Sequence, residues 1–322
     1  MRWTVAAPEH LRPAAVVICT HNRADDCSVT VARLASDEGA MADIDAVCVV
    51  DQGTDQVQTR AAFRDVADRL GSKLIYITQP NLGGAGGFSR GMYEITGSPN
   101  SAHANVILMD DDILCEPESV LRMNAFANMT VEPTIVGAQM LSLSNPQMLH
   151  VSAEREVLDE IKAGELTPGA RMGIDLIKKK QDARFDAGWN GWWTCLLPAE
   201  IIADCGLPIP LFFQWDDIEY GIRARFAGHP HGHPAQRRCV ARRLLPQGLR
   251  RLGAVLQHPQ RPHRLGDLRP VRRERHLQVP VPQDQRTDRV DAVRPGGDVH
   301  QGRRGLPDRA GLSARRGPGG AR

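Results

Sequence analysis

Two groups of carboxylates stand far apart in the sequence, and both contain residue types that could do chemistry. The first is Met-Asp-Asp-Asp-Ile at residues 109–113, and the second is Trp-Asp-Asp-Ile-Glu at residues 215–219. Adjacent carboxylates repel one another, and a bare charge is costly to bury, so a divalent cation would offset the repulsion in the first group. Mg²⁺ and Mn²⁺ take oxygen ligands and bridge phosphates. The first group therefore predicts a Mg²⁺ or Mn²⁺ site, and the alternative is a solvated acidic turn.

The spacing within each group suggests which carboxylates work together. Alternation along a strand sends Asp110 and Asp112 to one side and Asp111 to the other, so we expect the first two to face a ligand together. In the second group, one carboxylate could act as a general base if its neighbours tune its pKa. The alternative is an acid-rich helix start in which Asp216 caps the helix and Glu219 follows three residues later. Both interpretations can hold for different residues.

Two further segments have compositions that suit ligand binding. Asn-Leu-Gly-Gly-Ala-Gly-Gly at residues 81–87 allows close backbone approach and leaves amides free for phosphate. It has neither the G-x-G-x-x-G spacing nor a Walker lysine, which disfavours a dinucleotide-binding oxidoreductase. Residues 188–198 hold three of the five tryptophans, and aromatic rings beside Gly and Asn suit stacking on a sugar. The alternatives are a flexible turn and an aromatic cluster in the core.

The elements that would position these groups are four buried strands. Short apolar, β-branched runs predict them within residues 14–20, 44–54, 73–79 and 104–113. Helix-length segments separate the runs, which predicts an α/β fold with a doubly wound sheet. In such sheets ligands sit beyond the carboxyl ends of the strands. Polar residues gather at those ends, at 20–23, 51–52, 81–87 and 110–112.

Composition divides the chain in two near Pro230. The chain has 40 basic and 38 acidic residues. About 21 of the basic and seven of the acidic residues lie in residues 231–322, which leaves the first 230 residues with a net charge of about −12. Residues 231–322 also lack Ile, Phe, Trp, Tyr, Met and Lys, so they cannot bury enough apolar surface to offset chain entropy. We expect an N-terminal leader at 1–13, one domain at 14–230 and a disordered basic tail at 231–322.

The sequence also excludes some classes of protein. No run approaches the roughly 18 apolar residues of a membrane span. The N-terminus has too few hydrophobic residues before the first strand for a signal peptide. The seven cysteines are scattered without a C-x-x-C pair, which favours a reduced, cytoplasmic interior over a disulfide framework or a zinc site.

The motifs taken together resemble a known family. Cys-Thr-His-Asn-Arg, Asp-Gln-Gly-Thr, the Gly-rich segment, Met-Asp-Asp-Asp-Ile, Asn-Gly-Trp-Trp and Gln-Trp-Asp-Asp-Ile-Glu occur in that order over residues 14–230. They resemble the family-two inverting glycosyltransferases of the Rossmann-like GT-A fold, and more narrowly the polymerising galactofuranosyltransferases of arabinogalactan synthesis. The resemblance implies metal-dependent transfer of galactofuranose from UDP-galactofuranose to a lipid-linked galactan. It also implies a cytoplasmic protein with peripheral association at the inner face of the plasma membrane.

The resemblance implies roles for single residues as well. A nucleotide-sugar set matches at the strand ends: Thr20, Arg23, Gln52, Asn81 and Asp110. Asp112 matches the metal-binding aspartate, for Mn²⁺ or Mg²⁺. Asp217 matches the catalytic base. An acceptor-binding set matches elsewhere: Trp192, Trp193, Asp216, His150 and Glu154.

After Pro230 the chain departs from the family pattern. There the family continues with Thr-Val-Thr-Leu-Pro and then Trp-His, whose histidine completes the metal site. Read one nucleotide later, codons for residues 231–235 can give Thr-Val-Thr-Leu-Pro, and those for 240–242 can give Trp-His. We hypothesise that the tail is a frameshifted translation, which would leave a non-catalytic product with a partial UDP-binding half. The competing interpretation is a genuine basic tail that binds nucleic acid or anionic lipid, although a nucleic-acid partner is not expected.

Overall fold

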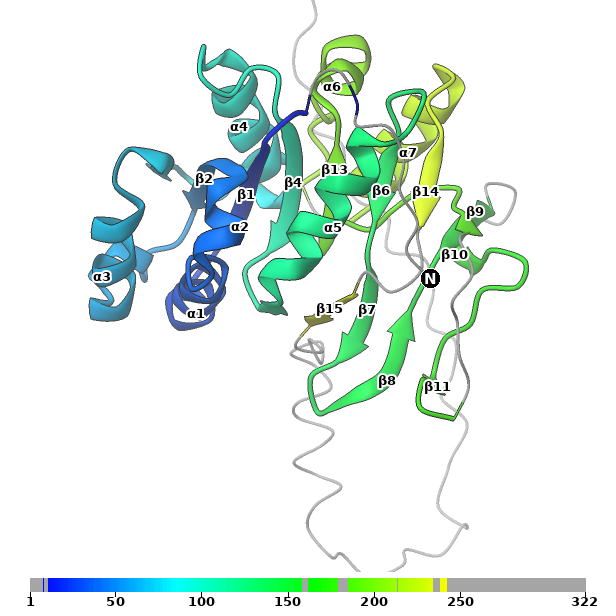
Figure 1. Ribbon diagram of the computed structural model, residues 1–322, viewed down its shortest axis with the longest axis horizontal. Coiled ribbons are helices and arrows are strands. Elements are labelled where there is room, and N and C mark those ends of the chain that lie inside the picture. Colours follow the sequence, from blue (N-terminus) through cyan, green and yellow to red (C-terminus); the bar gives the residue numbers. More distant parts are fainter. Residues whose placement is uncertain are drawn as a thin grey trace, which may run out of the picture. The chain divides into compact units, whose positions relative to one another are not determined.

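The central element is an eight-stranded sheet that bears out the α/β prediction (Figure 1). The computed structural model describes residue 8 and residues 11–157, 162–178, 185–212, 214–233 and 238–241. The strand order is β12-β14-β6-β13-β4-β1-β2-β3. In chain order the strands are β1 (Ala14–Thr20), β2 (Ile44–Asp51), β3 (Leu74–Thr78), β4 (Asn105–Asp110), β6 (Ile135–Gly137), β12 (Phe185–Asp186), β13 (Thr194–Leu197) and β14 (His231–His233).

The four predicted strands form the parallel half of this sheet. β1 pairs in parallel with both β2 and β4, and β2 pairs in parallel with β3. Val16 and Val17 point to opposite faces, yet both are fully buried, because helices cover the sheet on either side. This explains why β1 reads as a continuous apolar run. The carboxyl ends of these strands share one edge, which is where the polar motifs lie.

Helices pack on both faces of the sheet. On one face α1 (Ala24–Leu34), α3 (Ala61–Leu70) and α5 (Pro117–Asn128) share a core with the even-numbered side chains of β1. On the other face α4 (Gly83–Gly97), α6 (Ala199–Cys205) and α7 (Asp216–Phe226) share a core with the odd-numbered ones. Three short helices complete the connections: α2 (Glu38–Ala42), η1 (Val57–Thr59) and η2 (Gly71–Lys73).

A second sheet has the order β11-β8-β7-β15-β5. Its strands are β5 (Ile113–Cys115), β7 (Gln139–Ser142), β8 (Asn145–Val151), β11 (Ile174–Asp175) and β15 (Arg238–Ala241), and a separate pair is formed by β9 (Glu154–Val157) and β10 (Lys162–Leu166). β5 follows the acidic motif directly, so this sheet begins at the same edge as the predicted site. Figure 1 shows its strands below β6 and β4.

Regular structure continues past the boundary predicted at Pro230. β14 pairs with β6 and β12, and β15 pairs with β5 and β7. The sheet therefore takes in residues that composition assigned to the tail. The rest of the tail, 234–237 and 242–322, lies outside the described residues, as does most of the predicted leader. Among the described helices, none combines the length and the apolar character needed to cross a membrane.

Candidate functional site

A cavity of about 400 Å³ opens at the carboxyl edge of the central sheet. Asp110, the last residue of β4, borders it from one side, and Asp216 and Asp217, the first residues of α7, border it from another. The remaining lining residues are Gly84, Phe88, Trp189, Trp192, Trp193, Gln214, Trp215 and Ile218. The fold thus brings together the two carboxylate groups that lie about a hundred residues apart in the sequence.

Burial and mutual repulsion make the carboxyl groups of this cavity weak acids. Burial raises the pKa of Asp110 to about 8, and the charges of Asp112 and Asp111 add to the shift. Burial likewise raises the pKa of Asp217 to about 7, with a further contribution from the charge of Asp216. A carboxyl group whose pKa lies near neutrality can accept a proton during a reaction at that pH.

The acidic motif is shaped by the end of β4 rather than by strand alternation. β4 ends at Asp110, so Asp111 and Asp112 belong to the turn before β5. Arg23, at the start of α1, places its Nη1 2.9 Å from Asp112 Oδ2 and its Nη2 2.8 Å from Asp26 Oδ2. The resulting cluster combines one guanidinium with several carboxylates.

The residues of this cluster fit a hard divalent cation. All the donors are carboxylate oxygens, the ligands that Mg²⁺ and Mn²⁺ prefer. Asp112 Oδ2 is buried and has Arg23 Nη1 as a charged neighbour at 2.9 Å, so a cation would bind beside that guanidinium or in its place. A cation here would also relieve the repulsion that raises the pKa of Asp110.

Gln52 and Asn81 hold the loop that leads into α4. The Gln52 amide donates to the carbonyl of Gly83 at 2.9 Å and its oxygen accepts from the backbone N–H of Leu82 at 2.8 Å. Asn81 Oδ1 accepts from the backbone N–H of Gly83 at 3.0 Å. Both side chains are therefore engaged in shaping the loop.

The glycines at the start of α4 allow close packing. Gly83 has φ +74°, and a Cβ there would lie 1.6 Å from the carbonyl oxygen of Phe212. A Cβ at Gly87 would lie 2.1 Å from the sulfur of Cys19. Only glycine lets α4 approach both β1 and the segment before α7. The Gly-rich segment is thus the start of a closely packed helix rather than a flexible turn.

The two predicted acceptor-site tryptophans differ in their surroundings. Trp192 is buried and packs edge-on against Phe88 and Tyr220, with ring centroids 5.4 and 5.9 Å away. Trp193 is partly buried and its indole N–H donates to the carbonyl of Ala138 at 2.9 Å. Both line the cavity. Trp192 therefore both packs in the core and lines the cavity.

Glu154 lies close enough to Asp217 to raise its pKa. Its backbone forms a bridge with Trp189, a cavity residue, and burial raises the pKa of Glu154 itself to about 7. His150, on β8, is partly buried and is not among the residues that line the cavity. Thr20, the buried last residue of β1, is not among them either.

Comparison with known proteins identifies the domain. The profile of Glycosyltransferase like family 2 matches residues 12–239. The chain belongs to this family. The galactofuranosyltransferase GlfT2 of Mycolicibacterium smegmatis is 42% identical over 240 residues, which is 70% of this chain and 36% of that protein. GlfT2 of Mycobacterium tuberculosis is 40% identical over 227 residues, or 67% of this chain and 35% of that protein. The chain thus spans about a third of the length of these relatives.

A solved structure gives the same picture of the fold. The crystal structure of GalNAc-T7 with UDP, GalNAc and Mn²⁺ superimposes with a TM-score of 0.60 at 11% sequence identity, covering 74% of this chain and 45% of that one. At so low an identity the likeness concerns the fold alone. The predicted GT-A type of α/β fold is confirmed.

Several residues of this family-two domain were not predicted. Gln214 and Trp215 line the cavity, and both have positive φ angles, 64° and 68°. Trp215 is the N-cap of α7 and makes no side-chain capping bond, so the prediction that Asp216 caps the helix is wrong. Glu219 instead pairs with Arg223 one turn later. The position of Trp215 directly before Asp216 and Asp217 was the one sequence signal that could have indicated that Trp215 lines the cavity.

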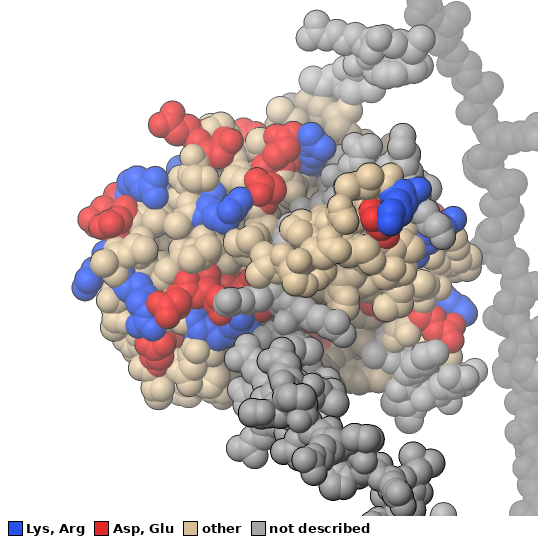
Figure 2. Space-filling model, turned by 90° about the horizontal axis from the view of Figure 1, so that it is seen from below, with Lys and Arg blue, Asp and Glu red and all other residues tan. Residues whose placement is uncertain are grey.

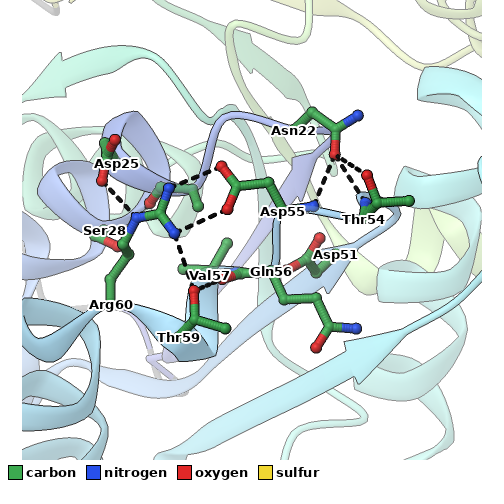
Figure 3. A network of polar contacts seen from close by, with 11 residues as sticks. Asn22, Asp25, Ser28, Asp51, Thr54, Asp55, Gln56, Val57, Thr59 and Arg60 are labelled. Atoms are coloured by element: carbon green, nitrogen blue, oxygen red, sulfur yellow. Dashed lines mark hydrogen bonds and ion pairs between the residues drawn. The ribbon is translucent and has the colours of Figure 1, made fainter.

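A polar network connects the loops after β1 and β2 (Figure 3). Asn22 has φ +54°, and its Oδ1 accepts from the backbone N–H groups of Thr54 and Asp55 at 2.8 and 3.0 Å. Arg60 holds Asp55 and Asp25 through its guanidinium. These contacts fix the loop between Gln52 and α3 against the segment that carries Arg23.

Replacing Asn22 with Ala should therefore loosen this edge of the domain. The change removes the side-chain oxygen that accepts from two backbone N–H groups, and it places Ala in a left-handed conformation. We therefore expect the free energy of unfolding to fall by about 1–2 kcal/mol. Asn22→Gly is the matched control, because it removes the same contacts without the conformational cost. Urea unfolding of both variants measures the difference, and equal stabilities would contradict the conformational part of the argument.

Proposed function

We propose that this domain transfers galactofuranose from UDP-galactofuranose to a lipid-linked galactan acceptor, with inversion at the anomeric carbon. The observation that carries the proposal is the cavity that sets Asp217 and the tryptophans on one side and Asp110 on another. Membership of the family and the identity to two galactofuranosyltransferases support the choice of sugar.

The donor is assigned to the carboxyl ends of the parallel strands. We place the diphosphate near Thr20 and Arg23, where the guanidinium offers a positive charge. Gln52 and Asn81 contribute by holding the loop before α4, and Asp110 contacts the nucleotide. A bound Mg²⁺ or Mn²⁺, held by Asp112, would neutralise the charge that develops on the departing diphosphate.

The acceptor is assigned to the side of the cavity formed by α7 and the tryptophans. Trp192 and Trp193 offer apolar faces for a sugar, while Asp216, Glu154 and His150 supply polar contacts. Asp217 takes the proton of the acceptor hydroxyl as that oxygen forms its bond to the anomeric carbon. The bond to UDP breaks on the opposite side, and UDP leaves with the bonding electrons. This geometry inverts the configuration at the anomeric carbon.

We further propose that the protein works in the cytoplasm, at the inner face of the plasma membrane, because the acceptor is a lipid. A nucleic-acid partner is not part of the proposal. Figure 2 shows Lys and Arg side chains interspersed with Asp and Glu among the described residues on the face seen from below.

The metal assignment predicts a selective effect of Asp112→Asn. We expect Mn²⁺-dependent UDP binding, measured by titration calorimetry, to weaken by about 10- to 100-fold, because the variant loses a charged ligand. Asp26→Asn is the control, since Asp26 also pairs with Arg23 but is not assigned to the metal. Equal losses in the two variants would show that the effect acts through Arg23 and would contradict the assignment.

A second candidate function is a non-catalytic product that retains a partial UDP-binding half. The observation that favours it is the pairing of β15 with β5, in which Ala241 lies opposite Ile113, the residue directly after Asp112. The Trp-His of the family falls at residues 240–242 in the shifted reading frame. The chain as it stands has Val240 and Ala241 beside the acidic motif, without that histidine.

Turnover of UDP-galactofuranose with Mn²⁺ or Mg²⁺ separates the two candidates. It should be measured for this chain and for a version with the frame corrected after Pro230. Turnover by the corrected version alone supports the second candidate for this chain, and turnover by both contradicts the loss of the site. A corrected version without turnover would overturn the galactofuranosyltransferase proposal. Detection of a tail peptide encoded by an intact gene would sink the frameshift hypothesis.

A further inference from the structure

Three metal-ligating side chains meet at the far end of α6 and α7, outside the cavity described above. One ligand atom each from Asp204, Cys205 and His229 lies within 4.8 Å of the other two. His229 Nε2 lies 2.8 Å from Asp204 Oδ2. A thiol, an imidazole and a carboxylate are the three ligand types that zinc takes in proteins.

The separation of these atoms suits one cation between them. With zinc–ligand distances of 2.0–2.3 Å, ligand atoms in a tetrahedral site stand about 3.4–3.6 Å apart. No pair of these atoms would need to close by more than about 1.4 Å, and the His229–Asp204 pair, 2.8 Å apart, would need to open by about 0.6 Å. The Asp204 side chain is 60% exposed, so it is free to rotate inward. The fourth position would face solvent and take water.

The backbone holds the three ligands in place before any ion arrives. Cys205 is the last residue of α6, and His229 is fixed by its N–H bond to the carbonyl of Ala224 in α7. Arg223 joins the two segments by donating from Nη1 to the carbonyl of Cys205. A preorganised cluster loses little conformational entropy on binding.

The local electrostatics also favour a cation. The cluster lies at the carboxyl ends of α6 and α7, where the helix dipoles are negative. The guanidinium of Arg223 is neutralised by two contacts with Glu219, at 2.6 and 3.0 Å. Asp204 contributes a full negative charge of its own.

We propose that Asp204, Cys205 and His229 form a zinc site that fastens the end of α6 to the end of α7. Because α7 begins with Asp216 and Asp217, such a site would hold the helix that carries part of the cavity. It is separate from the acidic motif in both place and chemistry, since that motif offers hard oxygen donors for Mg²⁺ or Mn²⁺.

The test is a titration of the full chain with Co²⁺, which reports cysteine ligation through a thiolate-to-metal charge-transfer band, followed by displacement with Zn²⁺. We expect one equivalent of Co²⁺ to give the band and Zn²⁺ to abolish it. Cys205→Ser should remove the band. Asp204→Asn and His229→Gln should weaken Zn²⁺ binding by about tenfold or more, as ligand-shell changes do at other sites.

His103→Gln is the matched control, because His103 is an exposed histidine outside the cluster. Its affinity for Zn²⁺ should equal that of the unaltered chain. Absence of the band, or a band that survives Cys205→Ser, would overturn the proposal. Asp204→Asn keeps the test valid if a cysteine variant folds poorly, since the exposed Asp204 can change without disturbing the core. Retention of full Zn²⁺ affinity in that variant would also count against the site.

Discussion

Asp217→Asn should lower the rate of sugar transfer by about 10²- to 10⁴-fold, the contribution typical of a general base. The variant keeps the shape of the side chain but cannot take the proton of the acceptor hydroxyl. UDP binding should change little, because Asp217 is assigned to the acceptor side of the cavity. Steady-state turnover and UDP titration, in whichever form of the chain is active, measure the two quantities. Equal losses in turnover and UDP binding would contradict the role of Asp217 as base.

The raised pKa of Asp217 predicts how the rate of transfer depends on pH. With a pKa of about 7 for Asp217, the base is protonated below that pH, and the rate should fall as pH drops through 7. The charge of Asp216 raises this pKa, so Asp216→Asn should move the acid limb of the profile to lower pH. Glu118→Gln, a change on the exposed start of α5, is the control and should leave the limb in place. A limb that does not move in Asp216→Asn would exclude the electrostatic coupling.

Replacing His231 and His233 together with Thr should remove a large part of the acid sensitivity of the fold. Burial lowers the pKa of each histidine to about 4, from an ordinary value of 6.5. Between those values the unfolded chain binds protons that the folded chain does not, so stability is lost as pH falls from about 6.5 to 4. Each histidine accounts for about 3 kcal/mol of that loss. Carboxyl groups such as Asp110 act in the opposite direction, but equally in both proteins.

The comparison of unfolding free energies at pH 7 and pH 4.5 measures this effect as a difference between the variant and the unaltered chain. His103→Thr is the control, because it removes an exposed histidine that lies outside β14. We also expect the double variant to be more stable at pH 7, since His231 Nε2 and His233 Nδ1 are buried and have no hydrogen-bond partner within the described part of the chain. Identical pH slopes in the two proteins would show that β14 accommodates charged histidine.

The surroundings of β14 bear on the frameshift hypothesis. A Cβ at Gly232 would lie 3.3 and 3.4 Å from carbon atoms of Phe126 and Thr134, and its two histidine neighbours are buried. Thr at 231 and 233 would leave fewer unpaired nitrogens, whereas Val at 232 would require Phe126 and Thr134 to shift by a few tenths of an ångström. Stabilisation of the His231→Thr, His233→Thr variant would support that interpretation.

Local sequence pattern was enough to predict the parallel strands and the places where chemistry could occur. The run at Ala14–Thr20 is apolar because both faces of a central strand are covered, so its bounds could be predicted to the residue. The acidic motif could be placed at the end of β4 because a strand core does not tolerate adjacent charges. Both inferences rest on local pattern and burial cost, which the sequence carries directly.

Folding of the whole chain established which distant segments meet. It brought Asp217 to the cavity that Asp110 borders, engaged Gln52 in holding the loop before α4, and made Trp215 rather than Asp216 the N-cap of α7. It also placed β14 and β15 within the sheets, beyond a boundary that composition had set at Pro230. The physical reason is that pairing with β6 or β5 depends on partners a hundred residues away, so a strand poor in large apolar side chains can still be held by its neighbours.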